Sequence, residues 1–164
     1  MADRKNQPDI LAPLLDRLTD EDPRVRQEGP VSYAQAVRRL RIALRRDLEW
    51  LLNTRQVIVP VPEWCTELPY SLFQYGLPDL TSFSVSNPQD QDRLASMIEQ
   101  AVANFEPRLM NVTVALLTSK SGARVVKFQI EGLLRIEPGP ERIQFDTTLD
   151  LASGSYHVEG ENNA

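Results

Sequence analysis

The hydrophobic residues in the first half of the chain recur with the period of an α-helix. A first run of aliphatic residues at helical spacing occupies residues 10–18. Ser32 and Gln35 have the spacing of a capping box, which predicts the start of a longer helix. That helix is expected to end near Asn53, after about five turns with a single apolar stripe. The stripe consists of Val37, Leu40, Leu44, Leu48 and Leu51.

A segment rich in proline and aromatic residues, residues 57–86, separates this helix from the next one. Within it, residues 70–75 are expected to form a short helix that Gly76 closes as a C-cap. A third helix is predicted from Asn87, a good N-cap that is followed by a first-turn proline. It ends near Phe105, because a proline two residues later disfavours helical backbone at the residue before it.

After that proline the hydrophobic period changes from 3.6 to 2, which indicates strands. Alternating segments occur at residues 110–116, 126–130 and 143–151, with a turn expected at residues 119–122. Helices followed by antiparallel strands predict an α+β fold, in which N-terminal helices pack on a C-terminal sheet of about three strands.

We expect one folded domain with a loose segment at each end. Residues 1–9 and 153–164 contain few large apolar side chains, so both are expected to be flexible. The single α+β domain is then expected to span residues 10–152. The N-terminal segment is charged and lacks the apolar stretch of an export signal, and we expect a cytoplasmic protein.

Composition narrows the function by exclusion. The chain has 164 residues, with 18 Lys and Arg against 23 Asp and Glu, and its net charge of −5 argues against general binding of nucleic acid or anionic membranes. Its single cysteine, Cys65, forbids an internal disulfide, and one histidine, His157, is too few for a Cys/His zinc site. We expect Cys65 to be a small buried hydrophobic residue and His157 a surface residue, which leaves nucleophilic catalysis poorly supported. The glycines lack the spacing typical of phosphate binding, and we expect no cofactor and no metal.

Paired carboxylates can also support glycoside hydrolysis, and Glu106 is the first candidate because a helix gives way to a strand there. Arg108 lies two residues away and is expected to hold Glu106 ionised, which does not suit a catalytic acid. A structural or partner-contact role for Glu106 is therefore the preferred interpretation.

The long helix is locally basic in an acidic protein. Arg38, Arg41 and Arg45 fall on one of its faces, at positions i, i+3 and i+7. This face is either simply solvated or a docking surface for an acidic protein, as in an adaptor. Nucleic acid is a third interpretation, which the lack of interleaved aromatic residues weakens.

The edges of the predicted sheet offer a different kind of site. An open antiparallel sheet has two outer strands, and either one can accept a strand from another chain. The alternative is that helices or loops cover both edges, and the sequence leaves this open.

Four segments together form a recognisable pattern over roughly residues 10–151. They are Leu14–Leu18 leading into Asp20–Pro23, Arg46–Arg55, Tyr75–Asp79 and Phe105–Leu109. The pattern resembles the TssE family of type VI secretion baseplate subunits and the wider baseplate wedge family of tailed phages, which has carried a lysozyme-like label. Glu106, Pro107 and Arg108 match the signature of that family residue by residue.

The resemblance implies a structural part of a contractile injection machine rather than an enzyme. A peptidoglycan hydrolase is the alternative that the lysozyme-like label suggests. The family assembles with TssF and TssG into wedges, with TssK in the same complex. We expect the chain to bind no nucleic acid and not to insert directly into the membrane. The family's fold is similar to the handshake domain of the sheath, so the chain would template polymerisation of the sheath subunits TssB and TssC, by strand addition.

The resemblance also assigns roles to the corner between the last helix and the first strand. Pro107 would end the helix and fix the direction of the chain into the strand. Glu106 and Arg108 would hold a wedge partner through charge-assisted hydrogen bonds. The alternative for this pair is an internal ion pair that holds helix and sheet together.

Overall fold

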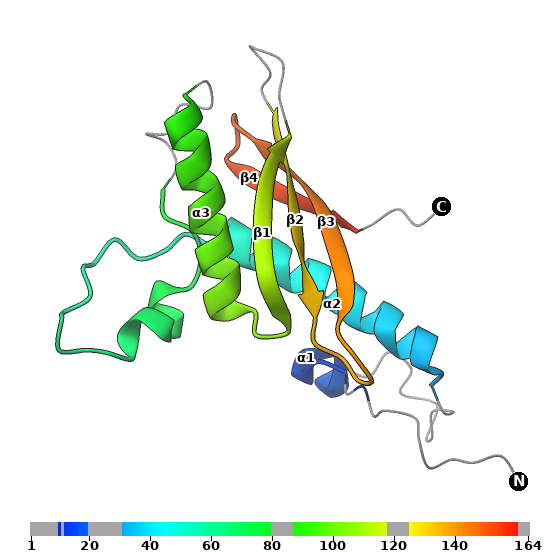
Figure 1. The fold of residues 1–164 in the computed structure, drawn as a ribbon. Coiled ribbons are helices and arrows are strands. Elements are labelled where there is room, and N and C mark those ends of the chain that lie inside the picture. The colour runs from blue at the N-terminus through cyan, green and yellow to red at the C-terminus, as the bar shows by residue number, and fades with distance from the viewer. Residues whose placement is uncertain (1–9, 11, 20–30, 80–86, 118–124, 161–164) are drawn as a thin grey trace, which may run out of the picture.

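Four antiparallel strands follow three α-helices along the described part of the chain (Figure 1). The computed structural model describes residues 10, 12–19, 31–79, 87–117 and 125–160. The elements are α1 (Leu14–Leu18), α2 (Tyr33–Asn53), the 3-10 turns η1 (Leu68–Tyr70) and η2 (Leu72–Gln74), α3 (Pro88–Phe105), β1 (Leu109–Leu117), β2 (Val125–Leu134), β3 (Glu141–Asp150) and β4 (Ser155–Gly160).

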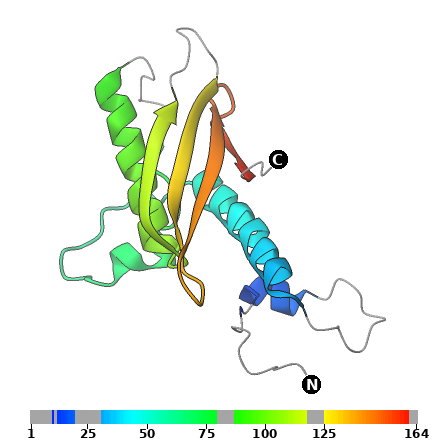
Figure 2. The ribbon, with the colours of Figure 1, turned by 45° about the vertical axis from the view of Figure 1, so that its right-hand side comes forward.

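The strands form one sheet in the order β1-β2-β3-β4, and α2 and α3 cover the same face of it (Figure 2). Helix α3 packs along β1 and α2 packs beside β4, and a single hydrophobic core joins both helices to all four strands. Side chains on the other face of the sheet alternate with the core residues and are more exposed. This arrangement confirms the predicted α+β fold.

The two long helices begin and end where their sequence signals predict. Ser32 and Gln35 form the expected capping box at the start of α2. The side chain of Asn87 caps α3, which ends at Phe105, two residues before Pro107. The predicted stripe of α2 is buried in full, and Leu44 and Leu48 are completely inaccessible to solvent.

Two short helices differ from the prediction. Helix α1 starts only at Leu14, because Pro13 disfavours helical backbone at the residue before it, and none of its residues is buried. The predicted helix over residues 70–75 is wrong, since η1 and η2 are separate 3-10 turns. Ser71 divides them, because its side chain accepts a hydrogen bond from the Phe73 amide and starts a new turn.

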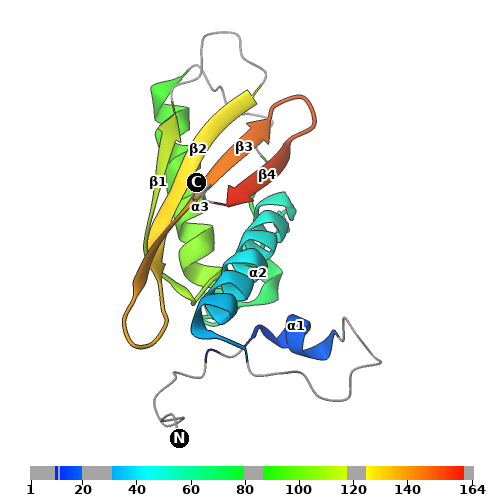
Figure 3. The same cartoon turned by 90° about the vertical axis from the view of Figure 1, so that its right-hand side faces the viewer.

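The predicted flexible tail at residues 153–164 needs correction, because it contains β4, which pairs along β3 (Figure 3). Tyr156 and Val158 point into the core and alternate with exposed His157 and Glu159, so a period of 2 is present but short. The sheet therefore has four strands, and the domain extends to Gly160. Residues 1–9, the expected turn at residues 119–122 and residues 161–164 lie outside the described residues.

Tyr156 on β4 gives the fold a predicted dependence on alkaline pH. Burial raises the pKa of Tyr156, while the charge of Arg55 opposes this effect, and the hydroxyl has no hydrogen-bond partner among the described residues. A tyrosine with a raised pKa in the folded state stabilises the fold below its ordinary pKa of about 10, and that contribution is lost as the pH rises further.

Replacing Tyr156 with phenylalanine is expected to stabilise the protein by about 1 kcal/mol at pH 7, because a buried hydroxyl without a partner is removed. At pH 11 the difference should grow by about another 1 kcal/mol, since only the parent chain gains an ionised tyrosine on unfolding. Urea unfolding of both proteins at the two pH values measures this difference. A loss of stability at pH 7 would instead indicate that the hydroxyl is hydrogen-bonded.

Candidate functional site

The corner between α3 and β1 is built from Glu106, Pro107 and Arg108. Glu106 is the C-cap of α3, and its backbone amide donates to the carbonyl of Val102 over 2.8 Å. Pro107 has no amide hydrogen and cannot continue the helix. The Leu109 amide then donates to the carbonyl of Glu106 over 3.0 Å, which closes the corner and starts β1.

The side chains of this corner form an internal ion pair. The guanidinium of Arg108 donates from Nε to Glu106 Oε1 over 2.5 Å, and from Nη2 to Glu106 Oε2. Nη2 also donates to Oδ2 of Asp47, on α2, over 2.7 Å. Glu106 is only 5% exposed, whereas the side chain of Arg108 keeps 26% of its surface. The fork geometry and the burial identify this as a strong, bidentate pair that joins three elements.

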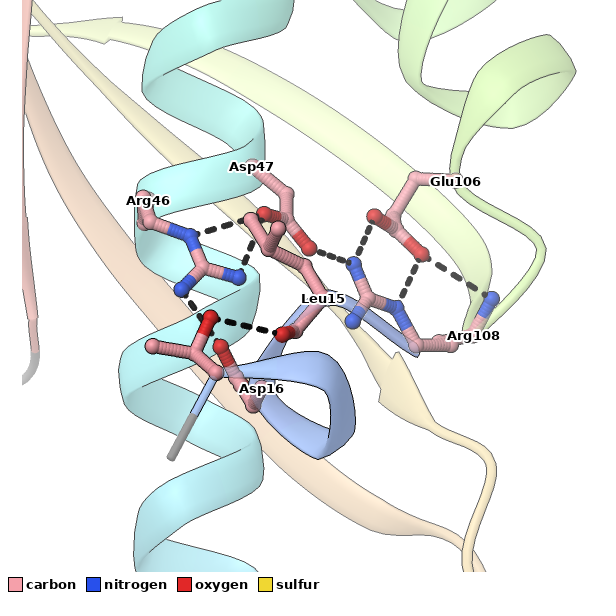
Figure 4. Close-up of polar contacts among 7 residues, drawn as sticks. Leu15, Asp16, Arg46, Asp47, Glu106 and Arg108 are labelled. Carbon is pink, nitrogen blue, oxygen red and sulfur yellow. Dashed lines mark hydrogen bonds and ion pairs between the residues drawn. The ribbon is translucent and has the colours of Figure 1, made fainter. Parts of the chain in front are cut away.

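The network continues from Asp47 along α2 to α1 (Figure 4). Oδ1 of Asp47 accepts a hydrogen bond from Nε of Arg46 over 3.1 Å, and Nη1 of Arg46 donates to Asp16 over 2.6 Å. The Arg46 guanidinium also lies 5.1 Å from the ring centroid of Trp50. Two arginines and three carboxylates therefore tie α1, α2, α3 and β1 together.

The electrostatics of the network favour fixed charges over proton transfer. Burial alone would lower the pKa of Arg108, but its hydrogen bonds to Glu106 and Asp47 outweigh burial and raise that pKa. The hydrogen bond to Asp16 is the main cause that raises the pKa of Arg46. Burial and the charges of Asp47 and Glu106 raise the pKa of Tyr75, which stays neutral at ordinary pH.

A surface hollow of about 350 Å³ lies over the corner, and Tyr75, Phe105, Pro107 and Arg108 line part of it. The rings of Tyr75 and Phe105 meet edge to face, with centroids 5.3 Å apart. The remaining guanidinium nitrogen of Arg108, Nη1, makes no hydrogen bond to another described residue. Arg108 thus keeps one donor for an incoming acceptor while its other donors hold the fold.

Only part of the predicted arginine face of α2 is exposed at the surface. Nη2 of Arg41 donates to Glu141, at the start of β3, over 2.6 Å, so this arginine contributes to the fold. Arg38 and Arg45 are exposed and form no ion pair within the described residues. The structure therefore leaves two of the three predicted arginines available on the surface.

The other candidate residues lie apart from the corner in the fold. Cys65 is half-buried in the loop between α2 and η1, so the predicted burial is only partial; its amide donates to the carbonyl of Pro62 within this loop. His157 is exposed on β4, with Nδ1 3.5 Å from a carboxylate oxygen of Glu49. The described residues contain no cluster of three or more potential metal ligands, and none of their helices is long and apolar enough to span a membrane.

Side chains of the helices contact the outer edges of the sheet. On β4, Asn53 exchanges two hydrogen bonds with the backbone of Tyr156, and Glu49 accepts a third from the Val158 amide over 3.5 Å. On β1, Glu99 of α3 accepts from the Val114 amide over 2.7 Å. Among the described residues this is the one side-chain hydrogen bond to the β1 backbone, which extends over nine residues, whereas the six residues of β4 receive four, the fourth from the side chain of Ser153 to the Ser155 amide. The edge of β1 is therefore the more accessible one.

Sequence reasoning found the corner but missed Asp47 and Asp16, which complete its network. A signal for Asp47 was available, because it lies directly beside Leu48 of the apolar stripe of α2. A half-buried acidic residue at the margin of an apolar stripe favours a cation close by, and Arg108 is that cation. Nothing in the local sequence around Asp16 indicates its contact with Arg46.

The comparison with protein families gave one match. The family model described as baseplate wedge protein gp25 matches residues 38–139, well over half of the chain. The matched region extends from α2 through β2 and includes the corner and its partner Asp47. No curated protein matches the chain.

Proposed function

We propose a specific assembly role from the premise that this chain belongs to the baseplate wedge protein gp25 family. Membership supports a structural role in a baseplate. We assign the chain to the baseplate of a contractile type VI secretion system, on the cytoplasmic side of a membrane-docked machine. In this role it assembles with the wedge proteins TssF and TssG, with TssK attached to the same complex, and it templates polymerisation of the sheath subunits TssB and TssC.

The observation that carries this proposal is the corner of α3 and β1. The buried ion pair fixes the position of Pro107 and Arg108, and both residues line the hollow at the surface. Because Glu106 is buried and already paired, the groups that reach a wedge partner are Pro107 and the free Nη1 donor of Arg108. A carboxylate or a backbone carbonyl of the partner is the expected acceptor.

The sheath contact is assigned to the outer edge of β1. The Val114 amide points away from β2, and the backbone alternates along an antiparallel strand, so the Leu116 amide points the same way. An added strand can pair there once Glu99 releases the Val114 amide. Asn53 and Glu49 already satisfy the corresponding groups of β4.

The contacts of Glu106 do not favour a lysozyme-like hydrolase. Both of its carboxylate oxygens accept hydrogen bonds from Arg108, and the side chain, which lines the hollow over the corner, is only 7% exposed. A glycosidase needs a protonated carboxylic acid that can reach the leaving group. The adaptor alternative has a smaller basic surface than predicted. Arg38 and Arg45 are exposed on α2, whereas Arg41 pairs with Glu141.

Reconstitution from purified proteins tests the proposal. We expect the chain to co-purify with TssF and TssG, and we expect slower hydrogen exchange of the Leu116 amide once TssB and TssC assemble on that complex. Mass spectrometry of the peptide that contains β1 measures this exchange. A chain that binds neither wedge nor sheath proteins would contradict the proposed function, and slower exchange on β4 in place of β1 would contradict the assigned edge.

A further inference from the structure

Residues 57–72 form an exposed, apolar arm beside the folded domain. Three of its large side chains are almost fully exposed: Ile58 at 88%, Trp64 at 83% and Leu72 at 84%. Val57, Val59 and Tyr70 are exposed as well. Figures 1 and 2 show this arm as the teal and green segment that extends away from the sheet, to the left of the lower half of α3. A folded domain rarely leaves so many large apolar side chains of one short segment in water unless another surface covers them.

The arm is held in a defined position. At its base, the Gln56 amide donates to the Leu77 carbonyl and the Leu77 amide donates to the Thr54 carbonyl, each over 2.9 Å. Within the arm, the Cys65 amide donates to the Pro62 carbonyl over 2.9 Å, and the turns η1 and η2 have their own hydrogen bonds. A positioned arm loses less conformational entropy on binding than an unstructured loop, which favours a docking role.

The charge of the arm indicates what kind of surface covers it. From Gln56 to Pro78 the sequence has no lysine, arginine or histidine, whereas Glu63 and Glu67 are both exposed. Segments that bind anionic lipid usually carry basic residues beside their aromatic ones. An apolar surface with two carboxylates is instead complementary to a protein surface that is apolar and has lysine or arginine at its rim.

A hollow of about 350 Å³ lies between the base of the arm and α3, and Gln56, Pro69, Leu77, Met97 and Phe105 line part of it. Phe105 also lines the hollow over the corner. The two hollows therefore adjoin at Phe105, and Pro69 of the arm lies at the first of them.

We propose that the apolar arm, residues 57–72, is a second docking surface for a baseplate protein whose contacting surface is apolar with a basic rim. This inference rests on the proposed function, because it takes the partner from the same baseplate. Ile58, Trp64 and Leu72 are the anchors, and Glu63 and Glu67 pair with the basic rim. Large apolar and aromatic residues of this kind dominate the energetics of protein interfaces.

The single cysteine of the chain provides a probe that needs no substitution. Cys65 lies within the arm and is half-buried in the isolated chain. We expect alkylation of Cys65 by N-ethylmaleimide to slow by about tenfold or more when the chain is in its complex with TssF and TssG, because the partner covers the arm. A Cys65→Ser chain with Ser153→Cys, in the turn between β3 and β4, is the control and should react at the same rate free and bound.

A matched pair of variants tests whether the arm supplies affinity. Replacing Ile58, Trp64 and Leu72 together with serine should weaken binding to the TssF and TssG complex by about 30-fold or more. The control replaces Val125 and Leu151 with serine, because both are exposed apolar residues at the end of the sheet opposite the corner. It should change the affinity by less than about threefold, and both variants should keep the urea unfolding curve of the parent chain.

The outcomes separate this inference from the proposed function. If Cys65 of the bound chain reacts as fast as in the free chain, the arm is not covered and the inference is overturned, while the assembly role stands. If the chain does not bind TssF and TssG at all, both fall. Dimerisation of the isolated chain that the triple substitution abolishes would assign the arm to self-association, and binding to phosphatidylglycerol vesicles would assign it to a membrane; either result overturns the inference.

Discussion

Replacing Arg108 with methionine is expected to lower the free energy of unfolding by about 2–4 kcal/mol. Methionine keeps most of the length of the side chain but leaves Glu106 buried without its cation. It also removes one of the two guanidinium groups that contact Asp47. An uncompensated buried carboxylate is costly, whereas the partial exposure of Arg108 limits the loss. Urea unfolding of the two purified proteins at pH 7 measures the difference.

A second substitution identifies the cause of that loss. Glu106→Gln in the Arg108→Met background removes the orphaned charge, so it should restore at least half of the lost stability. If the double variant is no more stable than the single one, the loss comes from packing of the arginine stem rather than from charge. This outcome would contradict the internal ion pair as the main role of Arg108 in the fold.

Stability and assembly can be separated at the same residue. Arg108→Lys keeps a cation near Glu106 but loses the planar fork and the free Nη1 donor. We therefore expect this variant to stay folded at ordinary temperature and yet to co-purify less with TssF and TssG. A lysine variant that assembles as well as the parent chain would show that Arg108 acts only within the fold.

The sequence carried enough information for the elements with strong local signals. Capping residues and apolar stripes located both ends of α2 and α3, because each signal lies within a few residues of the element that it defines. The corner was found for the same reason, since Pro107 marks the end of a helix. Strand β4 was missed because its alternating pattern is only six residues long and lies between small and polar residues.

Local sequence patterns do not predict which distant segments of the chain come into contact. Asp16, Asp47 and Arg108 lie on α1, on α2 and at the corner, and only the contacts of α2 with α1 and with the corner bring them together. The exposure of the arm could not be predicted either, because its side chains are apolar. Residues such as Ile58 and Leu72 have the composition of core residues, and no pattern in one sequence tells that the chain holds them outside.

Gly76 is the residue that fixes the base of the arm, and its replacement by alanine is expected to cost about 2–4 kcal/mol of unfolding free energy. Its φ of +107° lies in a region that residues with a Cβ atom rarely adopt. An alanine Cβ would also lie 2.3 Å from the carbonyl oxygen of Thr54, which is the acceptor for the Leu77 amide. The backbone must move, so the hydrogen bond from the Leu77 amide to the Thr54 carbonyl is lost. This hydrogen bond anchors the arm to the domain.

The same substitution should loosen the arm before the whole domain unfolds. Cys65 lies in the arm, so its alkylation rate in the isolated Gly76→Ala chain should rise severalfold, while far-ultraviolet circular dichroism stays close to that of the parent chain. Gly139→Ala is the matched control, because a Cβ at this position would meet no atom within 4 Å beyond its own residue and its two chain neighbours, and it should change stability by less than about 0.5 kcal/mol. Equal effects at both glycines would mean that the loss reflects the flexibility of the unfolded chain. A large effect at Gly76 alone would show that the backbone at the base of the arm has no room for a side chain there.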